Sequence, residues 1–175
     1  MKLIFPTIEM KQAALDFRRE HFDHGEMIIY GGAGLCMTEN YECWLQKINA
    51  DVTYEADNVR VPATAYFAVV DDEIVGIIQI RHVLNDHLRY DGGHIGYGVR
   101  PSARHKGYAT LMLAMALEKC RKLGISNALV VCEKENIGSV KTIIKNGGVF
   151  DSEYVDDDGI KSQRYWISTA PSPRA

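Results

Sequence analysis

Basic side chains and a glycine are gathered in one short stretch of the sequence, VRPSARHKGYAT, from Val99 to Thr110. It holds Arg100, Arg104, His105 and Lys106, followed directly by Gly107. Apolar residues at helical spacing come next, so we expect a helix to begin here. The first N–H groups of a helix have no acceptor within it, the helix dipole makes this end positive, and a glycine lets a ligand approach the backbone. The stretch therefore predicts a binding site for an anion such as a pyrophosphate.

The spacing of the glycines excludes two common phosphate-binding motifs. The stretch does not read GxxxxGK[ST], and the glycines before it are not spaced as GxGxxG. The pattern present is Arg104-x-x-Gly107-x-Ala109. The formal net charge of the chain is −3, whereas nucleic-acid binding normally draws on a basic face that meets many phosphates. We therefore expect a small anion as ligand and no nucleic acid as partner.

Histidines and cysteines give no metal or disulfide pattern. His21 with His24, and His82 with His87, have no third ligand at a recognisable spacing, so we expect no metal. The cysteines show no CxxC spacing, and we expect reduced, mostly buried thiols. These cysteines are Cys36, Cys43, Cys120 and Cys132.

Length and composition predict one globular domain. The chain has 175 residues, of which 46% are hydrophobic and 25% are charged. We expect a single domain over residues 1–170 and a frayed tail over residues 171–175. No apolar run approaches the length of a membrane span, and the apolar patch near the N-terminus is too short for a signal peptide. We therefore expect no membrane association and a cytoplasmic location.

The elements that position the basic stretch alternate between strands and helices. A helix at Tyr41–Ile48 has Thr38 as its expected N-cap, and Asn136 is the expected N-cap of a later helix. Gly124 and Gly147 are expected to follow the last turns of two helices. The expected order is a strand at 2–5, helices at 7–20 and 41–48, a hairpin at 63–84, a strand at 93–99, a helix at 107–124, a strand at 126–133, a helix at 136–147 and a final hairpin at 148–168.

The loop pattern and this order of elements together resemble the GNAT superfamily of acyl-CoA-dependent N-acetyltransferases. The signature loop of that family is (Gln/Arg)-x-x-Gly-x-(Gly/Ala), and Arg104, Gly107 and Ala109 match it. Asn136 and Ser139 match the Asn-x-x-Ser start of the helix after the fifth strand. The resemblance extends over residues 67–150. It implies an α/β (α+β) fold with a mixed, mostly antiparallel central sheet flanked by helices.

The resemblance also implies acetyl-CoA as the co-substrate and no metal. The pyrophosphate would be held mainly by backbone N–H groups, the main chain at Val99 would align the pantetheine arm, and Asn136 would reach that arm from the other side. In this family the fourth and fifth strands splay apart and the cofactor fills the gap, a place that suits Gly96 and Gly98. The residues implied in cofactor binding are Val99, Arg104, His105, Lys106, Gly107, Tyr108, Ala109, Thr110, Asn136 and Ser139.

Acyl transfer to an amine requires a neutral nucleophile, a polarised thioester carbonyl and a protonated leaving thiolate. The candidates for the base are His94 and Glu133. Many members of this family have a tyrosine seven residues after the helix asparagine, which serves as the acid that protonates the leaving thiolate. In this chain that position is Ile143. Tyr97, Ser139 or water is the alternative acid, unless the modest acidity of the thiol makes a dedicated acid unnecessary.

The orientation of the base candidate on the fourth strand depends on the regularity of that strand. A regular strand places Tyr97 and Val99 on one face and His94 on the other. A bulge near Gly96 or Gly98 would reverse this arrangement.

These features predict an enzyme that transfers an acetyl group from acetyl-CoA to a primary amine by direct attack in a ternary complex. The amine belongs to a small molecule, a peptide N-terminus or a lysine. The alternative is a non-catalytic acyl-CoA sensor or interaction domain, which Ile143 in place of tyrosine favours. A homodimer is a further expectation if Tyr165 and Trp166 lie at an interface instead of in the core.

Overall fold

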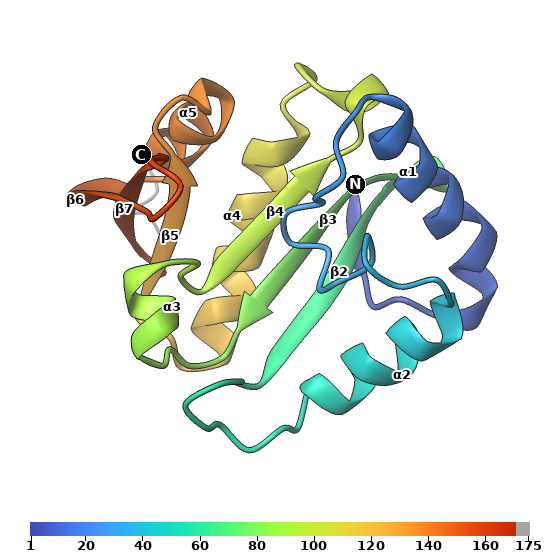
Figure 1. Cartoon of the computed structure of the whole chain (residues 1–175), viewed down its shortest axis with the longest axis horizontal. Coiled ribbons are helices and arrows are strands. Elements are labelled where there is room, and N and C mark those ends of the chain that lie inside the picture. The colour runs from blue at the N-terminus through green and yellow to red at the C-terminus, as the bar shows by residue number, and fades with distance from the viewer. Residues whose placement is uncertain (171–175) are drawn as a thin grey trace.

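Two antiparallel sheets and the helices packed against them make up the part of the chain that the structure describes, residues 1–170 of a computed structural model (Figure 1). The expected frayed tail, residues 171–175, lies outside the described residues. The elements in chain order are β1 (Lys2–Ile4), the 3-10 turn η1 (Ile8–Met10), α1 (Lys11–Asp23), α2 (Tyr41–Asp51), β2 (Ala63–Val70), β3 (Glu73–Arg81), α3 (Asp86–Tyr90), β4 (Ile95–Val99), the 3-10 turn η2 (Pro101–Ala103), α4 (Tyr108–Lys122), β5 (Asn127–Glu133), α5 (Ile137–Lys145), β6 (Val149–Val155) and β7 (Lys161–Ser168).

The two sheets meet at the start of β4 and then separate. One sheet has the order β1-β2-β3-β4 and the other has the order β5-β7-β6. The backbone N–H of His94 donates to the Leu129 carbonyl at 2.7 Å, and the Leu129 N–H donates to Nδ1 of His94 at 2.9 Å. From this meeting point the β4 and β5 arrows diverge toward their tips (Figure 1). The expected α/β fold, with a mostly antiparallel sheet flanked by helices, is confirmed.

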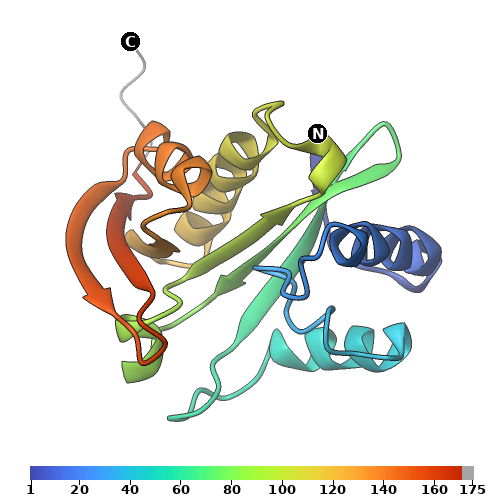
Figure 2. The same ribbon diagram turned by 45° about the horizontal axis from the view of Figure 1, so that its top comes forward.

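The four-stranded sheet is buried on both faces. Figure 2 shows α1 and α2 on one side of this sheet and α4 on the other. Ile77 of β3 packs with Phe17 and Trp44 in the core under α1 and α2, whereas the neighbouring Ile78 packs with Met112 in the core under α4. Burial on both faces explains why β3 reads as a nearly continuous apolar run instead of an alternating one.

Two local features differ from the sequence-based expectations. Helix α2 is capped by Asn40, whose side chain accepts from the N–H groups of Glu42 and Cys43, so the expectation of Thr38 as cap was wrong. Asn40 directly precedes the first helical residue, which is the position from which a short polar side chain reaches those donors. The short helix α3 in the connection from β3 to β4 was not predicted.

The bulge considered in β4 is absent from the pairing of β3 with β4. The register runs without a shift from Gly76 opposite Val99 to Ile80 opposite Ile95. Tyr97 and Val99 therefore share one face of the strand, as the regular-strand alternative predicts.

The helices within residues 1–170 are all too short or too polar to cross a membrane.

Candidate functional site

The gap between β4 and β5 has two ends of different character, which we call the open end and the closed end. At the closed end His94 is hydrogen-bonded to Leu129, as described above. At the open end Val99 and Glu133 finish the two strands. Since β4 is an edge strand and the Arg100 N–H donates toward β3, the alternating backbone groups of β4 at Tyr97 and Val99 are directed to the gap. The open end thus offers the N–H groups of Tyr97 and Val99, which have no acceptor within residues 1–170.

The loop before α4 presents a run of unpaired backbone donors. The N–H groups of residues 105–110 have no acceptor among residues 1–170. Gly107 precedes α4 with φ 81° and gives no side-chain cap, and His105 also has a positive φ of 62°. A Cβ added at Gly107 would meet nothing within 4 Å, so the space beside this backbone is open. Unpaired N–H groups at the N-terminus of a long helix form a typical anion site.

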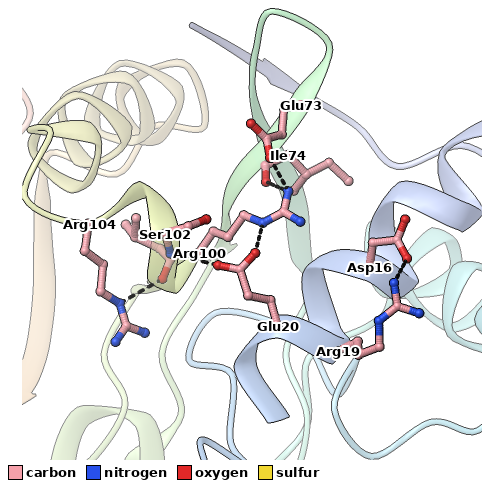
Figure 3. A network of polar contacts seen from close by, with 9 residues as sticks. Asp16, Arg19, Glu20, Glu73, Ile74, Arg100, Ser102 and Arg104 are labelled. Carbon is pink, nitrogen blue, oxygen red and sulfur yellow. Dashed lines mark hydrogen bonds and ion pairs between the residues drawn. The ribbon is translucent and has the colours of Figure 1, made fainter. Parts of the chain in front are cut away.

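The arginines of the basic stretch are already paired with carboxylates. Arg104 donates from both guanidinium ends to Glu26, at 2.5 and 2.6 Å, and from Nε to the Val99 carbonyl at 3.2 Å. Arg100 lies between Glu20 and Glu73 (Figure 3). The sequence suggested that Arg104 adds charge around the anion, but the carboxylate of Glu26 offsets that charge.

The carboxylates that pair with these arginines are held in their ionised form. The hydrogen bond from Arg104, opposed by burial and aided by His21, lowers the pKa of Glu26 to about 2. For Glu20, burial acts against ionisation, but hydrogen bonds from Ser102 and Arg100 outweigh it and lower the pKa to about 2. Within residues 1–170, the basic side chains of the loop that are exposed and have no acidic partner are those of His105 and Lys106.

Glu133 at the open end is linked to a residue far away in the sequence. The hydroxyl of Tyr30, in the loop between α1 and α2, donates to Oε1 of Glu133 at 2.6 Å. This hydrogen bond, together with partial burial, raises the pKa of Tyr30 to about 12. Tyr30 is 56% exposed, so a ligand can reach the pair from solvent. Tyr30 is not predicted as a site residue from the sequence, because no local pattern places it beside β5.

Gly96 and Gly98 of β4 leave room for the backbone of the loop between α1 and α2. A Cβ on Gly31 would lie 2.2 Å from the carbonyl oxygen of Gly96, and a Cβ on Gly98 would lie 2.9 Å from that of Tyr30. The close approach predicted for Gly96 and Gly98 therefore exists, but the approaching backbone is the loop between α1 and α2. This contact places Tyr30 over the gap.

The predicted base candidates do not lie together. His94 contacts Leu129, and the extended strand from Leu129 to Glu133 spans roughly 13 Å. Burial, together with the charges of Arg89 and Arg81, lowers the pKa of His94 to about 4, so its ring is neutral at pH 7.

A hydrogen bond between two hydroxyl groups connects β4 to α5. The hydroxyls of Tyr97 and Ser139 are 2.8 Å apart, and burial raises the pKa of Tyr97 to about 12. Asn136 caps α5 by accepting from the Ser139 N–H at 3.0 Å. Ile143 is fully buried in the core and offers no hydroxyl at the family's usual acid position.

Among residues 1–170 no group of three or more His, Cys, Asp or Glu side chains is arranged to hold a metal ion. The cysteines Cys36, Cys43, Cys120 and Cys132 are free.

The comparisons with known proteins agree with this geometry. The family model described as Acetyltransferase (GNAT) family matches residues 34–147, which include the loop before α4, both strands of the gap and α5. The chain belongs to the GNAT family. It is therefore an acyltransferase by family, as the resemblance predicted.

Solved structures of GNAT proteins share the fold at low sequence identity. Mycobacterium smegmatis RimJ in complex with CoA-disulfide has a TM-score of 0.74 and 21% identity, over 99% of this chain and 84% of that one. A variant of the spermidine N-acetyltransferase SpeG from Vibrio cholerae has a TM-score of 0.64 and 13% identity, over 97% and 96%. The microcin C7 self-immunity acetyltransferase MccE, in complex with acetyl-CoA and AMP, has a TM-score of 0.68 and 15% identity, over 95% and 91%. No curated relative matches the chain.

Proposed function

We propose that this GNAT protein transfers an acetyl group from acetyl-CoA to a primary amine, which attacks the thioester directly in a ternary complex. The observation that carries the proposal is the run of unpaired N–H groups at residues 105–110, beside the open end of the gap between β4 and β5. A pyrophosphate supplies the acceptors that these donors lack. MccE and RimJ, which have this fold, were solved with acetyl-CoA and CoA-disulfide.

The proposed cofactor site uses backbone more than side chains. Pyrophosphate is held by the N–H groups of residues 105–110, with Lys106 adding positive charge and the His105 ring adding a donor from the exposed side. The pantetheine arm lies along the open edge of β4 and is aligned by main-chain groups at Val99. Arg104 acts through Glu26 and the Val99 carbonyl and fixes the loop against the strand. Asn136 and Ser139 face the arm from the start of α5.

In the proposed mechanism Glu133 is the base. Its carboxylate stands at the end of β5, is reachable from solvent beside Tyr30, and removes a proton from the ammonium form of the acceptor. An N–H on the open edge of β4 polarises the thioester carbonyl. The leaving thiolate takes its proton from the Tyr97 hydroxyl, which stays protonated at neutral pH and is hydrogen-bonded to Ser139. The second proton, which the attacking nitrogen gives up as the amide forms, restores the Tyr97 hydroxyl through solvent. A catalytic role for His94 stays a prediction.

Calorimetric titration with acetyl-CoA tests the cofactor site, with ATP and NAD as controls. We expect selective, saturable binding of acetyl-CoA and a sharp loss of affinity in the double variant Lys106→Glu with Gly107→Val. Unchanged affinity in that variant would remove the pyrophosphate assignment. Binding of ATP or NAD in place of acetyl-CoA would mean that the site takes a different phosphate ligand.

Release of free CoA with a panel of amines tests the transfer step. A small-molecule amine, a peptide N-terminus and a lysine side chain represent the acceptor classes that the sequence leaves open. We expect CoA release above background with at least one class. Binding of acetyl-CoA with no release for any amine would favour the acyl-CoA sensor instead.

A cytoplasmic location is part of the proposal, and the free state of the four cysteines supports it. A homodimer also stays a prediction. Its basis is weaker than the sequence suggested, because Tyr165 is buried in the core and supplies no interface.

A further inference from the structure

A second hollow lies at the closed end of the gap, away from the loop before α4. Its volume is about 340 Å³, and it lies between the connection from β3 to β4 and the strands β5 and β7. The lining residues used below are Leu84, Arg89, His94, Asn127 and Trp166. The chain carries a net charge of −3, yet neither Asp nor Glu lines this hollow. No carboxylate in the lining therefore repels an anion.

His94 contributes a ring donor to the hollow. The residue is 8% exposed, and its Nδ1 accepts the N–H of Leu129. A neutral imidazole that accepts at Nδ1 carries its proton on Nε2, so Nε2–H is a donor. No acceptor for it is found among residues 1–170. Among residues 1–170, the side-chain nitrogen or oxygen that is buried without a hydrogen-bond partner is Nε2 of His21 alone, so Nε2 of His94 is reached by solvent and is free to donate to a ligand in the hollow.

Arg89 supplies a positive charge beside this ring. Its guanidinium is exposed and has no carboxylate partner among residues 1–170, and its charge contributes to the low pKa of His94. The arginines of the open end differ in this respect, because Arg100 and Arg104 are both paired. The Trp166 indole N–H and the Asn127 amide also lack partners within the described residues.

We propose that the hollow at the closed end binds a small carboxylate. Arg89 and Nε2–H of His94 donate to the carboxylate oxygens, and the hydrocarbon part of the ligand lies against Leu84 and the Trp166 ring. The volume is near the lower limit for ligand pockets, which suits a short-chain acid. This site shares no residue with the acetyl-CoA site and does not depend on the proposed acetyl transfer.

NMR titration with butyrate tests the site, with butyramide as the uncharged match and sodium chloride at the same ionic strength as a salt control. We expect saturable shifts of the Trp166 indole N–H and of the His94 ring signals with butyrate alone. The Trp44 indole N–H is an internal control, because it donates to the Gly32 carbonyl in the other core. A bound anion also stabilises the protonated ring, so the His94 pKa should rise from about 4. Absence of these shifts at saturating butyrate would overturn the proposal.

Two substitutions separate this site from the loop before α4. Arg89→Gln removes the cation from an exposed side chain and should weaken butyrate binding about tenfold, since hydrogen bonds to charged groups contribute strongly. Lys106→Glu at the open end should leave butyrate binding unchanged. Equal binding by the Arg89→Gln and wild-type proteins would contradict the assignment. Loss of butyrate binding only in Lys106→Glu would place the anion at the other end.

Discussion

The two ends of the gap between β4 and β5 both offer donors to anions, but they do so with different parts of the chain. At the open end the arginines are paired with Glu20, Glu73 and Glu26, and the unpaired donors are backbone N–H groups. At the closed end the backbone is paired between His94 and Leu129, and the unpaired donors are side chains. Anion binding at the open end should therefore be sensitive to changes in backbone conformation, and anion binding at the closed end should be sensitive to changes in side-chain charge.

The largest effect is expected from Glu133→Gln at the open end. Loss of a general base typically lowers the rate about a hundredfold to ten-thousandfold, so kcat should fall by that order while acetyl-CoA affinity stays the same. Glu135→Gln is the matched control, because it makes the same charge change at an exposed side chain without a hydrogen bond in residues 1–170. CoA release under saturating substrates is the measurement. A similar loss in both variants would point to overall charge instead of a base.

The next effect concerns the backbone of the loop before α4. Gly107→Val forces a β-branched residue to φ 81°, at a strain of roughly 2 kcal/mol, and should weaken acetyl-CoA binding about thirtyfold. Lys106→Ala, one residue away, should weaken it only about threefold because a single exposed charge contributes little. Calorimetry on both variants compares the contribution of the loop backbone to acetyl-CoA affinity with that of the Lys106 side chain. A larger loss of acetyl-CoA affinity in Lys106→Ala than in Gly107→Val would mean that the open end, like the closed end, binds its anion mainly through side chains.

A smaller effect is expected on stability from Glu26→Gln. The variant loses the ion pair with Arg104, which is partly exposed, so the free energy of unfolding at pH 7 should fall by about 1 kcal/mol. The folded-state pKa of Glu26, about 2, lies below its usual 4.5, so this stabilisation is complete above pH 4.5 and is lost as the pH falls toward 2. Denaturant unfolding between pH 7 and 3 checks this. If the free energy of unfolding falls equally steeply with pH in the variant and the wild type over the acid range, the ion pair does not contribute this stabilisation.

The smallest effect is expected from Tyr97→Phe. A free thiol is acidic enough to leave without much help, so loss of the hydroxyl next to Ser139 should lower kcat only about threefold. Ser139→Ala removes the other hydroxyl of this hydrogen bond and should also lower kcat only about threefold. A loss of a hundredfold in Tyr97→Phe alone would instead identify this hydroxyl as an essential acid.

The sequence predicts the elements well where the pattern is local. Helix α4, the hairpin of β2 and β3 and the Asn136 cap all follow from periodicity and capping residues near in sequence. The pairing of Tyr30 with Glu133 spans 103 positions and that of Glu26 with Arg104 spans 78, so no local pattern encodes either. The sequence therefore predicted correctly that the basic stretch directly precedes a helix, but the pairing of its arginines required the tertiary structure.

The loop between α1 and α2 also limits how this protein can be redesigned. The loop is tied to the rest of the protein through Glu26, Tyr30 and the close contact of Gly31 with Gly96. An exchange of this loop for one from a relative would therefore also disturb the support of the loop before α4. Such a graft needs to retain the carboxylate at position 26 and the glycine at position 31, so the two loops cannot be exchanged independently of each other.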